Sequence, residues 1–169
     1  MKDVVVAILF CVCLALGNQA RCATLPDACG NDQVQFDVTT QKGQSAPAPP
    51  EAGKAQIVFV ELTYGLAVTV RIGMDGQWVG ADKGDSTYFT LDVTPGLHHL
   101  CASWQSSKSY WDRLVGLYAL NAERGGTYYF LVKPVASEYF NDFTFAPLNE
   151  DEGKYLVKIS ALSTATRKK

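Results

Sequence analysis

From Lys54 onward, short runs rich in β-branched and aromatic residues alternate with segments that contain Gly, Pro or Asp. Apolar and polar positions alternate with a period of two in several of these runs, which is typical of strands with one buried face. Gln56–Leu62 is apolar almost throughout and predicts a central strand buried on both faces. Further strands are predicted at Ala67–Met74, Gln77–Gly80, Ser86–Val93, Leu97–Trp104, Leu117–Ala122, Thr127–Lys133 and Phe143–Phe145.

The segments between these strands contain turn sequences. Asp75-Gly76 predicts a two-residue hairpin turn, because both residue types tolerate positive φ. Thr94-Pro95-Gly96 is expected to turn the chain from Ser86–Val93 into its partner strand, and Arg124-Gly125-Gly126 to form the tip of a further hairpin. Strands at this spacing indicate an all-β fold over residues 54–148, an antiparallel β-sandwich of immunoglobulin-like or transthyretin-like type, or a barrel.

A helix is predicted near the C-terminus, at Asn149–Leu162. Asn149 can cap it, and Glu152 three residues later completes a capping-box pattern. We expect the helix to pack on the sandwich through the apolar positions that share one face, which are Tyr155, Leu156, Ile159 and Leu162. Residues 163–169 are expected to form a basic, solvated tail, and Ser109–Val115 a short helical turn between strands.

The N-terminal residues 1–22 have the pattern of a secretory signal peptide. Val4–Leu16 is apolar and uncharged, but it is shorter than the ~20 residues that a membrane-spanning helix needs. Ala20 and Cys22 are small residues at the positions that signal peptidase reads, so we expect cleavage before Ala23. The alternative is an uncleaved N-terminal anchor. Cys22 and Cys29 lack a lipidation context, so the expected product is periplasmic or secreted, without a stable membrane anchor.

Residues 23–53 form a predicted leader and linker. Gln33–Val38 alternates polar and apolar side chains, which indicates a half-buried edge strand. Ser45–Gly53 contains three of the seven prolines and is expected to be extended. Cleavage would leave Cys29 and Cys101 as the remaining cysteines, and such a pair predicts a disulfide in an oxidising compartment. Two unpaired buried thiols are the alternative.

Composition narrows the class of protein. The 169 residues suit a single domain, and 47% hydrophobic against 19% charged residues argues against wholesale disorder. A formal net charge of −2 does not provide the positive surface that a nucleic-acid partner requires.

Two stretches resemble a known bacterial family. Arg71–Cys101 contains the D-G turn, the W-V-G step, Tyr88-Phe89 and the sequence V-T-P-G-L-H-H-L, and Glu123–Phe130 follows with a G-G-T-Y-Y-F pattern. In combination these resemble the family called domain of unknown function 2846, with a more distant similarity to PEGA-type modules. The resemblance covers roughly residues 54–147. It implies an exported β-sandwich and implies no enzymatic activity.

Candidate catalytic and metal-binding residues are few. His98 and His99 are adjacent in a predicted strand, so their side chains should point to opposite faces and not share a metal ion. Asp82, Asp85 and Asp92 do not follow the spacing of a calcium loop. The usual hydrolase, zinc and nucleotide-binding motifs do not occur in the mature region, so we expect no enzyme, no cofactor and no metal site.

Aromatic residues are the remaining candidates for a binding site. Trp104, Tyr110 and Trp111 flank a Ser-rich loop and could dock a ligand, with Trp78 as a further candidate. The alternative is that these rings belong to the core or plug a sheet edge. The sequence therefore predicts an exported, non-catalytic module that binds a protein or an envelope component. A carbohydrate-binding module that uses these aromatics, or an uncharacterised enzyme, is the alternative.

Overall fold

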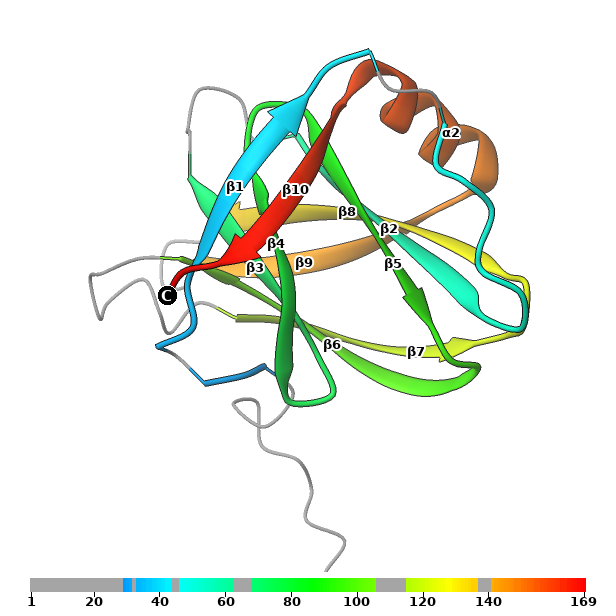
Figure 1. Ribbon diagram of the computed structural model, residues 1–169, viewed down its shortest axis with the longest axis horizontal. Coiled ribbons are helices and arrows are strands. Elements are labelled where there is room, and N and C mark those ends of the chain that lie inside the picture. Colours follow the sequence, from blue (N-terminus) through cyan, green and yellow to red (C-terminus); the bar gives the residue numbers. More distant parts are fainter. Residues whose placement is uncertain (1–28, 32, 44–45, 63–67, 106–114, 137–140) are drawn as a thin grey trace, which may run out of the picture.

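The computed structural model describes residues 29–31, 33–43, 46–62, 68–105, 115–136 and 141–169. Within this part the protein is mostly β, with sheets of six and four strands and one short helix near the C-terminus (Figure 1). The predicted signal peptide, and the predicted helical turn except for its last residue Val115, lie outside the described residues.

The elements follow one another in this order: β1 (Phe36–Gln41), β2 (Ala55–Glu61), β3 (Thr69–Met74), β4 (Gln77–Lys83), β5 (Thr87–Val93), β6 (Gly96–Trp104), β7 (Val115–Ala122), β8 (Thr127–Ala136), β9 (Asn141–Leu148), α2 (Glu150–Ile159) and β10 (Ala161–Arg167). The larger sheet has the strand order β1-β10-β5-β2-β8-β9, and the smaller sheet has the order β4-β3-β6-β7. This arrangement is consistent with a β-sandwich and confirms the predicted predominance of strands.

The larger sheet is mixed, so the prediction of a purely antiparallel fold is wrong. β2 is antiparallel to β5 but parallel to β8, and β10 is parallel to β5. Between β2 and β8 the chain visits the smaller sheet twice. A long excursion of this kind allows a strand to re-enter beside an earlier one in the same direction.

Two predicted hairpins are also wrong, because the chain crosses between sheets at their turns. β5 belongs to the larger sheet and β6 to the smaller one, so Ser86–Val93 and Leu97–Trp104 do not pair. β7 and β8 are likewise in different sheets. By contrast, the Asp75-Gly76 hairpin is confirmed: φ is 52° at Asp75 and 82° at Gly76, and Met74 pairs with Gln77 across the turn.

The main core lies between the sheets. Every residue of β2 is buried, which confirms the strand predicted to be covered on both faces. Phe59 of β2 stacks on Phe89 of β5 with 5.2 Å between ring centroids, and inward residues of β3, β6, β7, β8 and β9 complete the cluster. Phe143–Phe145 is part of β9 and is not the last strand, because β10 follows α2.

A second cluster covers the outer side of the smaller sheet. Cys29 and Cys101 form the predicted disulfide, with 5.1 Å between their Cα atoms, and both are buried with Phe36 and Trp78. β1 pairs antiparallel with β10 from Phe36↔Arg167 to Gln41↔Leu162, which confirms an edge strand in the leader. The disulfide and this pairing hold the leader against the sandwich.

The C-terminal region departs from the prediction after the helix cap. The capping box between Asn149 and Glu152 is present, but α2 ends at Ile159, three residues before the predicted Leu162. Ala161–Arg167 forms β10 between β1 and β5, so the prediction of a solvated tail is wrong for Ser163–Arg167. The polar Ser, Thr and Arg residues of this strand do not indicate a strand in the sequence, and its pairing partners lie far away along the chain.

The face of α2 that packs on the sheet is also different from the predicted stripe. Val157 and Gly153 are buried, whereas Tyr155 and Ile159 are 61% and 50% exposed. Val157 packs in a third cluster, with Val58, Val60, Tyr88 and Tyr129 on the outer side of the larger sheet. Because Gly153 allows the helix to lie close to Tyr129, the contact face runs through the small residue and not through the larger apolar ones.

Candidate functional site

The predicted aromatic site is not formed by the tryptophans that the structure describes. Trp104 is only 9% exposed and packs edge-on against Phe143, with 4.6 Å between ring centroids. Trp78 is 2% exposed, its Nε1 donates to the carbonyl of Asn31, and the Arg71 guanidinium lies 4.3 Å from its ring centroid. The prediction that Trp104 belongs to an exposed docking face is therefore wrong. Tyr110 and Trp111 lie outside the described residues.

His98 is held between two hydrogen-bond acceptors. Its Nδ1 lies 2.7 Å from Asp75 Oδ2 and its Nε2 lies 2.7 Å from the Thr94 carbonyl oxygen. Burial disfavours the charged ring, but these hydrogen bonds outweigh it and raise the pKa of His98. Both ring nitrogens can donate only in the imidazolium form, so this side chain joins two turns and is not placed as a base. His99 is exposed, which confirms the predicted opposite orientations.

The three aspartates considered for calcium lie in different environments. Asp82 is buried, and its Oδ1 accepts hydrogen bonds from the Ser163 hydroxyl and from the Lys83 amide; burial raises the pKa of this carboxyl. Asp85 is exposed, and Asp92 accepts hydrogen bonds from other residues, described below. In the described ranges, no three His, Cys, Asp or Glu side chains are grouped as metal ligands would be.

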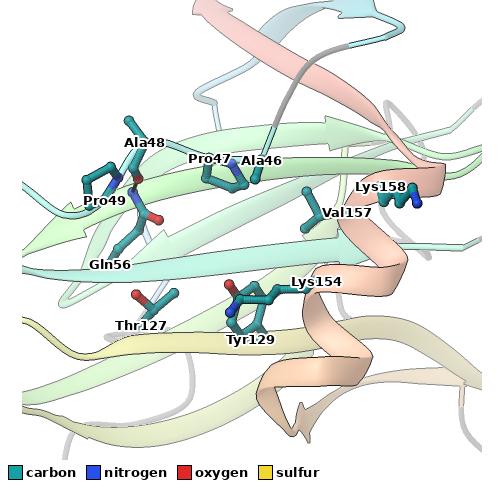
Figure 2. A pocket seen from close by; sticks show the side chains of 10 residues that line it. All are labelled: Ala46, Pro47, Ala48, Pro49, Gln56, Thr127, Tyr129, Lys154, Val157 and Lys158. Carbon is teal, nitrogen blue, oxygen red and sulfur yellow. Dashed lines mark hydrogen bonds between the residues drawn. The ribbon is translucent and has the colours of Figure 1, made fainter.

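A pocket lies where the Pro-rich segment passes over the outer side of the larger sheet beside α2 (Figure 2). Its volume is about 380 Å³, within the usual range for small-ligand sites. The Pro-rich segment forms one wall, β2 and β8 form the floor, and α2 forms the opposite wall. The described lining residues are Ala46, Pro47, Ala48, Pro49, Gln56, Thr127, Tyr129, Lys154, Val157 and Lys158.

Gln56 fixes the Pro-rich wall. This side chain is 6% exposed, and its Nε2 donates to the Ala48 carbonyl at 2.9 Å and to Asp92 Oδ1 at 3.2 Å. Asp92 Oδ2 in turn accepts from the Glu51 amide at 2.9 Å. Prolines have no amide hydrogen, so they cannot donate ladder hydrogen bonds to the sheet. The side chains of Gln56 and Asp92 supply the polar contacts that hold the segment in place.

Tyr129 forms the base of the pocket below the helix. The residue is 8% exposed, and burial raises the pKa of its hydroxyl, which therefore stays protonated at neutral pH. Among the described residues this hydroxyl makes no hydrogen bond, and neither does that of Thr127. Two hydroxyl groups are thus available to a molecule in the pocket.

The helix wall carries positive charge. Lys154 Nζ lies 2.5 Å from Glu150 Oε1, and this hydrogen bond raises the pKa of Lys154. Lys158, one turn later, makes no ion pair within the described chain. The lining residues named above include these two lysines and no Asp or Glu. The pocket therefore combines apolar walls with hydrogen-bond donors and cationic groups.

Sequence reasoning did not identify this pocket. It predicted the C-terminal helix and the extended Pro-rich segment, but it did not place them together. The feature of the sequence that could have indicated the pocket is Gln56, a polar residue next to a run of buried apolar residues. A polar side chain that is buried needs a hydrogen-bond partner. The partner, Ala48, belongs to a segment with no periodic pattern, so only the folded structure shows the contact.

Comparisons of this chain with protein-family models, curated proteins and solved structures found no match. In the described part of the chain, no helix has the length and apolar character needed to cross a membrane.

Proposed function

We propose that this protein is an exported, non-catalytic binding module whose ligand, a component of the cell envelope or a secreted partner, enters the pocket between the Pro-rich segment and α2. The observation that carries the proposal is the pocket itself, a concave site with apolar walls and unpaired donors from Tyr129 and Thr127. Buried apolar surface would supply affinity, and the few polar groups would orient the ligand.

Export is supported by two independent features. Val4–Leu16 has the length and composition of a signal-peptide core, and the Cys29–Cys101 disulfide is of a kind that persists in oxidising compartments. A periplasmic or secreted location accounts for both.

The finer fold assignment and the family are also part of the proposal. We assign the domain to the immunoglobulin-like or transthyretin-like sandwiches, with mixed pairing in one sheet, and relate it to the domain of unknown function 2846. The quoted motifs support this, because Asp75-Gly76 and Pro95-Gly96 stand at turns where that family's pattern has them. The C-terminal strand β10 is an addition that the motifs do not cover.

A binding role is favoured over catalysis by the state of the polar groups. The His98–Asp75 pair resembles part of a hydrolase triad, but the Nε2 that would have to accept a proton is held at the Thr94 carbonyl. The carbohydrate-binding alternative depended on exposed rings, and Trp104 and Trp78 are buried. The pocket instead offers a single aromatic side chain, Tyr129, largely covered by the helix.

The experiment is site-specific photo-crosslinking in the native host. A photoreactive amino acid at Thr127, on the floor of the pocket, should give a discrete cross-linked product in the envelope or secreted fraction. The matched control is the same amino acid at Leu117, an exposed position of β7 in the other sheet. Equal products from both positions, or none from Thr127, would contradict the proposed site.

A further inference from the structure

The charge and the hydrogen-bond donors of the pocket point to one class of ligand. We infer that the pocket binds a small amphipathic carboxylate, with its aliphatic body between Pro47 and Val157 and its carboxylate toward Lys154, Lys158 and the Tyr129 hydroxyl. This inference rests on the proposed function, since it names the ligand class for the same site.

The charge of the pocket lining indicates an anionic ligand. The described lining contributes two lysines one helical turn apart, so its charged groups are both positive and favour an anionic group such as a carboxylate. Two carboxylates outside the lining act on Lys154: Glu150 forms an ion pair with it, and the charge of Asp151 has a smaller effect. Figure 2 shows the Lys154 side chain extending over Tyr129, with Lys158 farther along the helix.

The base of the pocket supplies a hydrogen-bond donor. The Tyr129 hydroxyl is protonated at neutral pH because burial raises its pKa, so it can donate to a carboxylate. No described residue accepts a hydrogen bond from it. A ligand oxygen in the pocket could therefore accept a hydrogen bond from this hydroxyl.

The walls and floor of the pocket disfavour an extended peptide as the occupant. Pairing with a peptide backbone requires unpaired amide and carbonyl groups along a wall. Pro47 and Pro49 have no amide hydrogen, and the Ala48 carbonyl already accepts from Gln56. On the floor, the strands β2 and β8 are paired with each other through Gln56↔Thr127 and beyond. The site therefore suits a compact molecule whose polar part is a single anionic group.

The test is isothermal titration of the full mature chain with sodium hexanoate, with hexanamide and hexylammonium as neutral and cationic analogues. Hexanoate should bind at least about tenfold more tightly than hexanamide, because the donors then meet a charged acceptor. Hexylammonium should not bind. The affinity for hexanoate should fall as salt is added.

Variants separate the roles of the charges. Lys158→Gln should weaken hexanoate binding several-fold, and Lys83→Gln, on β4 of the other sheet, should leave it unchanged. Glu150→Gln should strengthen binding, because it releases the Lys154 ammonium from its ion pair. Tyr129→Phe should weaken binding while the melting temperature stays nearly constant, since the hydroxyl has no described protein partner.

The outcomes distinguish an error in the ligand class from an error in the proposed binding function. Equal affinities for hexanoate and hexanamide, or unchanged binding in Lys158→Gln, would overturn the carboxylate assignment and leave a ligand pocket of another class. Failure of every probe together with a cross-link at Thr127 would also overturn the inference and preserve the proposed function. Failure of every probe and no cross-link at Thr127 would overturn both.

Discussion

Gly153 lies directly on the ring of Tyr129, so close that a Cβ atom at position 153 would overlap the ring carbons. This contact sets the distance between α2 and β8 beside the pocket. A glycine inside a helix normally destabilises it by ~1 kcal/mol relative to alanine. Here the small residue allows the helix to approach the sheet and to bury Val157.

Gly153→Ala should therefore destabilise the protein even though alanine is the better helix former. We expect a loss of about 1–3 kcal/mol in the free energy of unfolding, as for other overpacked sites. Urea denaturation monitored by circular dichroism measures it. The double variant Gly153→Ala/Tyr129→Ala should lose less stability than the sum of the losses in the two single variants. Removing the Tyr129 ring also removes the overlap that an alanine at position 153 would cause. A stability gain in the single variant would show that helix and sheet are not in this contact.

His98 should make stability depend on pH. Its folded-state pKa is raised, so its contribution is complete below the ordinary histidine pKa of about 6.5 and is lost as pH rises through the folded-state pKa. For Asp75, burial opposes ionisation, but the hydrogen bonds from the His99 amide and from His98 outweigh it and lower the pKa. The contribution of Asp75 to stability is therefore present above about pH 4 and is lost as pH falls.

The free energy of unfolding should thus differ most between wild type and His98→Gln from about pH 4 to pH 6.5. A difference of about 1–3 kcal/mol is expected there, decreasing toward alkaline pH. His99→Gln is the matched control, since that neighbouring side chain is exposed. A difference that is constant from pH 5 to pH 9 would argue against an imidazolium between Asp75 and Thr94.

The Cys29–Cys101 bond joins residues 72 positions apart. On the chain-entropy model, a loop of this length stabilises the protein by roughly 4 kcal/mol, so Cys29→Ser/Cys101→Ser should lower the denaturation midpoint strongly. Alkylation of the denatured, unreduced protein should label neither cysteine. Quantitative labelling of both would show that the bond is absent from the native protein.

Export makes a separate prediction about the N-terminus. Protein isolated from the native host should have the intact mass of a chain that begins at Ala23, as the small residues Ala20 and Cys22 indicate. Recovery of a chain that still begins at Met1 from the cytoplasm would contradict both the cleavage site and the export on which the proposed function depends.

Features determined by neighbouring residues were predictable from the sequence. The Asp75-Gly76 turn and the Asn149–Glu152 capping box are present, because each depends on backbone preferences within a few residues. The choice of sheet after a turn was not predictable in this way. Thr94-Pro95-Gly96 indicates a change of direction, but the strand that follows belongs to the other sheet. The sheet that a strand joins depends on which distant strands pack best against it.

The pocket could not be predicted for the same reason. It depends on the approach of Ala48 to Gln56 and of Gly153 to Tyr129, contacts between segments with no shared pattern. The prediction for Trp104 was wrong because composition does not indicate burial: this residue ends a strand whose last residues are all buried. A polar residue in an apolar strand and a glycine in a helix were the more useful signals, since each requires a specific neighbour.

The central claim is that a ligand enters the pocket between the Pro-rich segment and α2. The most direct measurement is a nuclear magnetic resonance titration of the ¹⁵N-labelled mature chain with soluble extract of the host envelope. The largest amide shift changes should occur at Gln56, Thr127, Tyr129, Lys154 and Lys158, which line the pocket. Changes centred instead on the exposed face of β6 and β7, or no changes at the pocket residues, would contradict the account.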